Sequence, residues 1–108
     1  MQTVIDDKNA IFTLINTFHV SPENQLAVVE SLERFTLFHA RQMKGFIASS
    51  VHTSLDRTKV VNYVQWESKG HIETMLTSDV ARRHLDEVSA LANNIDPVTY
   101  EVAFVVSM

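Results

Sequence analysis

The chain has 108 residues, of which 45% are hydrophobic and 20% charged, and its formal net charge at pH 7 is −4. This length and composition indicate one globular domain, assigned to residues 10–108, after a polar segment 1–9 that we expect to be flexible. The negative charge and the lack of a dense Lys/Arg cluster argue against nucleic acid or an anionic membrane as the main partner.

The absence of cysteine excludes disulfides, thiolate metal sites and a cysteine nucleophile. No apolar run is long enough to span a bilayer, and the first ten residues do not have the pattern of a signal peptide. We therefore expect a cytoplasmic protein without membrane contacts.

The first half of the chain predicts a strand followed by a helix. Apolar and polar residues alternate over Ile11–Val20, and Asn16 interrupts an apolar face of this strand. Ser21-Pro22 is typical of a helix start, and Lys44-Gly45 of a helix end. The apolar stripe expected on this helix consists of Leu26, Val29, Leu32, Phe35 and Phe38.

A hairpin is expected next, with a Ser- and Thr-rich strand over residues 46–54 and a second strand from Thr58. In the second strand Asn62 lies on an apolar face that ends at Trp66. A buried amide without a partner costs roughly 1–3 kcal/mol, so we expect Asn62 to be bonded to another protein group or to a bound molecule. Trp66 lies roughly 13 Å along the same face, which matches the length of a fused polycyclic ligand.

Two helices and a strand are expected in the remainder. Ser68 is the predicted N-cap of a short helix that carries Ile72 and Met75 on its inner face, and Ser78 is the predicted N-cap of the next helix. The inner stripe of that second helix is expected to hold Ala81, His84, Leu85, Val88, Leu91 and Ala92. Residues 93–97 are expected to break it, and the pattern predicts a last strand over Val98–Met108 with Tyr100 on one side.

This order of elements is typical of an α+β, ferredoxin-like split βαβ fold, a four-stranded antiparallel sheet with helices on one face. The first and third strands are then central neighbours, so Asn16, Asn62 and Trp66 are expected to line a cavity between sheet and helices. The opposite sheet face also carries apolar residues. We expect a second copy of the sheet to cover it, which predicts a homodimer through the sheet face.

The segment VVNYVQWES and the stretch INTFHV around Asn16 resemble the antibiotic biosynthesis monooxygenase family of dimeric α+β barrel proteins. The resemblance covers about residues 11–106 and is densest over residues 58–68. The family members that these segments resemble are cofactor-independent oxygenases that act on anthrone-type polyketide intermediates. By this resemblance Asn62 and Trp66 stand at two active-site positions, and Asn16 at a first-strand asparagine that several members use.

Two positions depart from that pattern. Where the polyketide enzymes place a tyrosine this chain has Ile72, and where they place a helix arginine it has Asp86, with Arg82 and Arg83 one turn away. A haem-degrading branch of the same fold uses a first-strand asparagine, a helix tryptophan and a helix histidine that ligates iron. Asn16 matches the first of these positions. Met75 and Leu85 occupy the other two, and His84 is one residue from the histidine position.

The sequence has no Gly-rich nucleotide loop, and its five histidines lack the spacing of known metal motifs, so we expect neither cofactor nor metal. Cofactor-free oxidation by molecular oxygen is possible when the substrate is itself a reductant, such as a small electron-rich aromatic. Asn62, Trp66 and Asn16 are the candidate catalytic residues. The other candidates for substrate contact are His52, Ile72, Met75, His84 and Tyr100. The base is solvent, the substrate's own phenolate or a nearby histidine.

These residues also have purely structural interpretations. Trp66 fits a core or rim aromatic, a strand asparagine often bonds to neighbouring backbone, and His84 fits a satisfied core histidine. Two other functions therefore remain open. One is a non-catalytic ligand-binding or sensing domain that kept the pocket and lost the chemistry. The other is haem binding and degradation.

Overall fold

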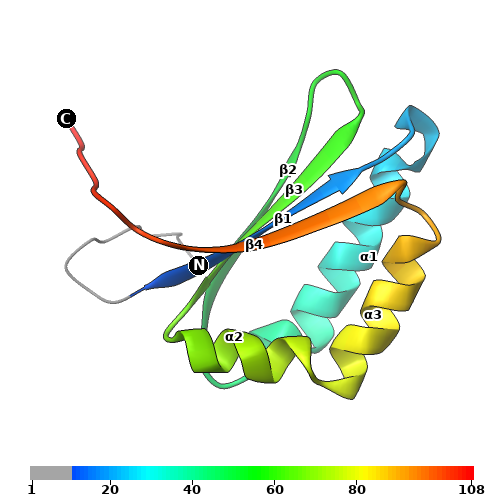
Figure 1. Cartoon of the computed structure of the whole chain (residues 1–108). Coiled ribbons are helices and arrows are strands. Elements are labelled where there is room, and N and C mark those ends of the chain that lie inside the picture. The colour runs from blue at the N-terminus through cyan, green and yellow to red at the C-terminus, as the bar shows by residue number, and fades with distance from the viewer. Residues whose placement is uncertain (1–10) are drawn as a thin grey trace.

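The computed structural model describes residues 11–108 as a four-stranded antiparallel sheet with helices packed on one face (Figure 1). The strand order is β2-β3-β1-β4, which confirms the predicted ferredoxin-like arrangement with the first and third strands at the centre. The strands are β1 (Phe12–His19), β2 (Phe46–Thr53), β3 (Lys59–Trp66) and β4 (Asn94–Glu101). The segment 1–9 that was expected to be flexible lies outside the described residues.

The predicted long first helix is shorter than expected. It consists of a 3-10 turn η1 (Pro22–Asn24), the helix α1 (Gln25–Phe38) and a second 3-10 turn η2 (Ala40–Gln42). The backbone leaves the helical conformation at His39, and Gly45, with a φ of 89°, turns the chain into β2. Proline occupies the first position of η1 as predicted, but the side chain of Ser21 makes no capping hydrogen bond.

The buried face of α1 is also rotated relative to the predicted stripe. Val28, Ser31 and Leu32 are buried, whereas Leu26 and Phe38 are 67% and 64% exposed. The apolar residues of this helix span more than half of its circumference, so the pattern alone does not define which side faces the sheet.

The two later helices, α2 (Lys69–Leu76) and α3 (Asp79–Ser89), begin at the predicted caps. The hydroxyl of Ser68 accepts a hydrogen bond from the backbone N–H of His71 at 3.1 Å. The hydroxyl of Ser78 accepts one from the N–H of Ala81 at 3.2 Å. Each serine thus satisfies one of the N–H groups that a helix start leaves without an intrahelical partner. Within residues 11–108, no helix has the length and apolar character that crossing a membrane requires.

The last strand lies earlier in the sequence than predicted. Residues 94–101 form β4, whereas residues 102–108 have no regular secondary structure and run away from the sheet (Figure 1). Pro97, which was read as part of a helix break, lies inside β4 opposite Asn16. This is possible because β4 is an edge strand that pairs only with β1, so one side of its backbone needs no partner.

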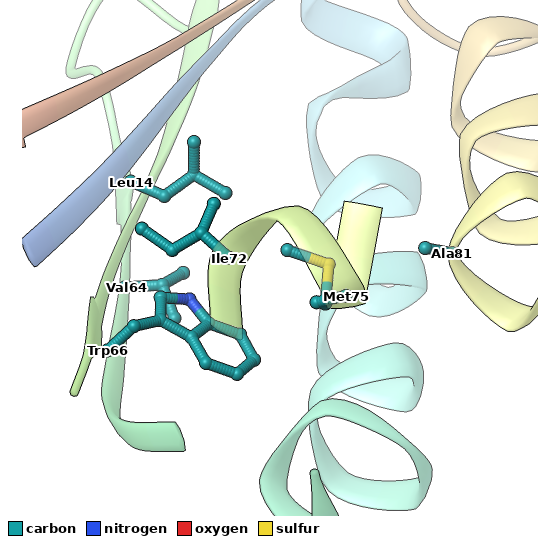
Figure 2. Packing of buried hydrophobic residues seen from close by; sticks show 6 residues of the cluster. All are labelled: Leu14, Val64, Trp66, Ile72, Met75 and Ala81. Carbon is teal, nitrogen blue, oxygen red and sulfur yellow. The ribbon is translucent and has the colours of Figure 1, made fainter. Parts of the chain in front are cut away.

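The core between sheet and helices consists of two clusters. One contains Leu14, Val64, Trp66, Ile72, Met75 and Ala81. Figure 2 shows Leu14, Val64 and Trp66 projecting from the sheet toward Ile72 and Met75 of α2. The other contains Phe18, Val20, Val28, Leu32, Val60 and Val88.

Within residues 11–108, no helix covers the opposite face of the sheet (Figure 1). Strands β1, β3 and β4 contribute half-buried and exposed apolar residues to this face. They are Ile15, Val61, Tyr63, Val98 and Tyr100. We call these five residues the outer face.

Gly45 provides a test of the turn that positions β2. Its positive φ disfavours other residues, and a Cβ atom there would lie 2.3 Å from Cγ of His71. We expect Gly45→Ala to lower the free energy of unfolding by about 2 kcal/mol or more, measured by urea denaturation. Gly70→Ala is the matched control, because its Cβ would meet only the Ser68 hydroxyl at 3.6 Å and alanine favours the helix. Equal stability of the two variants would contradict this account.

Candidate functional site

The two asparagines singled out in the sequence lie directly opposite one another. In the antiparallel register of β1 and β3, Asn16 pairs with Asn62, and Phe12 pairs with Trp66. Residues paired in this way point to the same side of the sheet, with Cβ atoms about 5 Å apart. Both carboxamides therefore project from the centre of the sheet toward the helices, on the same face as Trp66.

Asn62 is buried, and its amide oxygen is occupied by a protein group. The hydroxyl of Ser49 on β2 donates a hydrogen bond to Oδ1 of Asn62 at 2.9 Å. This contact fixes the orientation of the carboxamide and leaves its NH₂ group as a donor for a ligand. Neither asparagine side chain has a backbone hydrogen-bond partner within residues 11–108.

A cavity of about 360 Å³ lies between the sheet and the helices and contains both asparagines in its wall. Its lining is mainly apolar and includes members of both core clusters. The polar side chains that line it are Asn16, Thr36, Ser49, Asn62, Thr77, Arg82 and His84. A mainly apolar wall with a few convergent polar groups is typical of small-molecule sites.

Trp66 belongs to both the core and the cavity. Its side chain is 1% exposed, packs edge-to-face on Phe46 with ring centroids 5.6 Å apart, and lines the cavity. Its indole N–H is buried and has no hydrogen-bond partner within residues 11–108. A buried donor without a partner costs about 1–3 kcal/mol, and a ligand oxygen is one group that would satisfy it.

The cavity brings together five of the eight residues named from the sequence. Met75 and His84 line it together with Asn16, Asn62 and Trp66.

The other three lie elsewhere. Ile72 is 1% exposed and packs in the core cluster around Trp66, outside the lining. His52 and Tyr100 are on the face of the sheet that the helices do not cover, because their partners in the register are Val61 and Thr13. The imidazole of His52 contacts the hydroxyl of Ser50 at 3.0 Å.

His84 on α3 is held by two residues of α1. Its ring stacks on Phe35 with centroids 4.3 Å apart and planes 5° from parallel. Its Nδ1 lies 3.5 Å from the hydroxyl of Ser31, at the outer limit of a hydrogen bond. Burial lowers the pKa of His84 to about 4; Glu87 opposes this effect, and Arg34 and His39 add to it. The imidazole is therefore neutral at pH 7.

A second cavity of about 280 Å³ is lined by residues of α1 and α3 and shares His84 and Phe35 with the main cavity. Its polar lining includes Arg34, His39, Arg83 and Glu87. Arg34 and Glu87 form an ion pair whose side chains are about half exposed.

The helix arginine of the family pattern is the second position at which this chain departs. Asp86, at the expected arginine position, is exposed and lines neither cavity. Arg82 lines the main cavity and pairs with Asp79 at 3.3 Å, and Arg83 lines the second cavity. Of these two arginines, Arg82 is therefore the one whose side chain lines the cavity that contains the asparagines.

The fold and site define a small ferredoxin-like α+β domain with a ligand-sized cavity under its helices. Residues 11–87 match the family described as antibiotic biosynthesis monooxygenase, and the chain belongs to this family. It is 37% identical over 76 residues to the tetracenomycin-F1 monooxygenase of Streptomyces glaucescens, a match that covers 70% of this chain and 68% of that protein.

Solved structures agree with this assignment. A monooxygenase from the gene ActVA-Orf6 of Streptomyces coelicolor, in complex with nanaomycin D, superposes with a TM-score of 0.80 at 28% identity over 94% of this chain and 96% of that one. SnoaB, a cofactor-independent oxygenase from Streptomyces nogalater, has the same fold. Its TM-score is 0.76 at 20% identity, covering 92% of this chain and 99% of SnoaB.

Proposed function

We propose that this protein is a cofactor-independent monooxygenase that oxidises an electron-rich aromatic substrate, anthrone-like or a hydroquinone, with molecular oxygen. The observation that carries the proposal is the pair of opposed carboxamides, Asn16 and Asn62, in the wall of a mainly apolar cavity that also contains Trp66. Membership of the monooxygenase family supports it, as does the name of the relative that is 37% identical.

The volume of the cavity suits a molecule of a few fused rings. Its volume of about 360 Å³ lies within the range of roughly 300–1,000 Å³ that small-molecule sites occupy. The similar structure from Streptomyces coelicolor holds the ligand nanaomycin D, which supports an aromatic guest for this chain as well.

The chemistry does not require the protein to supply electrons. For an anthrone, one substrate and one O₂ give one quinone and one water. The ring CH₂ loses both hydrogens, one oxygen atom becomes the new carbonyl, and the other leaves as water. The substrate anion is the reductant. The protein's tasks are to orient the rings, exclude water and donate hydrogen bonds to the developing oxyanion.

Each of the three residues has a role in this scheme. The NH₂ group of Asn62, oriented by Ser49, and the carboxamide of Asn16 hold the carbonyl or phenolate oxygen. Trp66 packs against the ring system. One preorganised donor of this kind is worth about 3 kcal/mol, or roughly 10²-fold in rate.

Oxygen uptake with a panel of anthrones and hydroquinones tests this assignment. We expect Asn62→Ala to lower kcat/KM roughly 10²-fold, because it removes the donor. We expect Ser49→Ala to lower it about tenfold, because it removes only the contact that orients the donor. Ser50→Ala is the matched control: it is on the same strand but faces the other side of the sheet, so its rate is expected to equal that of the parent.

The outcomes separate the functions that the sequence left open. Oxygen uptake by Asn62→Ala at the parental rate would show that the assigned site is wrong. If the parent binds the aromatic panel but consumes no oxygen, the protein is instead a non-catalytic ligand-binding domain, an outcome that Ile72 and Asp86 at the tyrosine and arginine positions would explain. A saturable Soret shift on titration with haemin would favour the haem-degrading function.

We also propose that the protein is a homodimer that buries the outer face. The helices leave this apolar face uncovered (Figure 1), and the same face of a second copy would bury it. In such a dimer His52 and Tyr100 lie at or near the interface.

Sedimentation analysis tests the dimer. We expect the parent to sediment as a dimer and Val61→Asp to sediment as a monomer, because an unpaired carboxylate in the interface is costly. Leu55→Asp is the matched control, since Leu55 is a fully exposed apolar residue in the hairpin turn and is not part of the outer face. A monomeric parent, or a dimeric Val61→Asp variant, would contradict the proposal.

A further inference from the structure

Few side chains in the main cavity can take up a proton. Among residues 11–108, the titratable groups in its lining are Arg82 and His84. A guanidinium remains protonated at any physiological pH and cannot act as a base. Among the described residues of the cavity wall, His84 is therefore the titratable group that is neutral at pH 7 and has a lone pair to accept a proton from a substrate.

The surroundings of His84 distinguish its two ring nitrogens, because a hydroxyl group lies beside Nδ1. In a neutral imidazole one nitrogen is a donor and the other an acceptor. The hydroxyl of Ser31 lies on the Nδ1 side and is itself buried, at 1% exposure. When Nδ1 carries the hydrogen and donates to this hydroxyl, Nε2 presents its lone pair. The parallel stack on Phe35 holds the plane of the ring.

His84 also separates two different environments. It lines the mainly apolar cavity that contains the asparagines, and it lines the second cavity beside Arg34, His39 and Glu87. The second cavity has half-exposed charged walls, so it gives a proton on His84 a route to solvent that does not cross the substrate site.

From this arrangement we propose that His84 is the catalytic base of the reaction. Its Nε2 removes the proton from a substrate hydroxyl in the main cavity and releases it to water through the second cavity. The proposal rests on the proposed oxygenase function. In this step one O–H bond breaks and one N–H bond forms, giving phenolate and imidazolium, and no electrons leave the substrate until it meets O₂.

Burial and the charges around His84 keep the free imidazole neutral. Arg34 and His39, from the α1 side, disfavour an imidazolium, whereas Glu87 favours it. The other charged residues of α3 that line the two cavities are Arg82 and Arg83. With a pKa of about 4, the free imidazole is neutral at pH 7 and is a weak base until a counter-charge forms beside it. The phenolate that forms beside it then stabilises the imidazolium, as Glu87 already does in part.

The pH dependence of oxygen uptake tests the proposal. Because the base must be neutral, the parental kcat/KM is expected to be constant near pH 7 and to fall as the pH drops toward the pKa of His84. We expect His84→Gln to lower kcat/KM at pH 7 at least about 10²-fold. Its remaining rate should rise with pH as the substrate ionises in solution. His19→Gln, which alters a histidine that lines neither cavity, should keep the parental profile.

Chemical rescue separates a base from a structural residue. We expect added imidazole to restore oxygen uptake to His84→Ala in a saturable manner, in proportion to its neutral form. Ser31→Ala keeps the imidazole but removes its partner on Nδ1, and we expect it to lower kcat/KM about tenfold.

The failure of each proposal is distinguishable. A parent that consumes no oxygen with any substrate overturns the oxygenase function itself. An active parent whose natively folded His84→Gln variant keeps the parental rate and pH profile overturns the role of His84. A natively folded His84→Ala variant that is inactive and is not rescued by imidazole also overturns the role of His84 as the base.

Discussion

The register between β1 and β3 is the constraint on which the site depends. It places Asn16 opposite Asn62 and positions Trp66 four residues further along the same face. A slip of one residue would turn one of the two asparagines to the outer face and separate the pair. The register is stabilised by Phe18 and Val60 at one end of the strand pair and by Leu14 and Val64 toward the other, all of them buried under the helices. The packing that stabilises the fold therefore also positions the carboxamides.

The site retains polar groups that would not favour folding on their own. Asn62 is buried with one hydrogen bond to Ser49, and the N–H of Trp66 is buried with no partner in the described part of the chain. Each such group weakens the fold by about 1–3 kcal/mol relative to a fully satisfied one. A ligand whose oxygens accept hydrogen bonds from these groups would remove this cost. Ligand binding would then raise the free energy of unfolding. The neutral His84 fits the same pattern, because its burial disfavours the charged form.

Much of the fold could be predicted from the sequence because its signals are local. The alternation in β1 and β3 and the caps at Ser68 and Ser78 depend on neighbouring residues, and the structure agrees with them. The last strand was misplaced because Pro97 usually interrupts a strand, and only its edge position in the sheet makes it acceptable. That edge position is set by pairing with β1, which no local pattern reveals.

The site was predictable in part for a similar reason. The pairing of Asn16 with Asn62 follows from the topology, but the role of Ser49 depends on an irregularity in the pairing of β2 with β3 between Phe46 and Ala48. The extra residue there changes which serines of a Ser-rich strand face the helices. Ile72 was expected to contact substrate, but the helix turns it against Trp66 in the core.

The central claim is that a flat aromatic molecule binds between Trp66 and the two asparagines. Trp66 is the single tryptophan of the chain, so its emission reports on this cavity. Titration of the protein with a dihydroxyanthraquinone should quench the emission saturably, with a Kd about tenfold weaker for Asn62→Ala, equivalent to about 1.4 kcal/mol. Binding that leaves the emission of Trp66 unchanged, or that is equally tight in Asn62→Ala, would contradict the account.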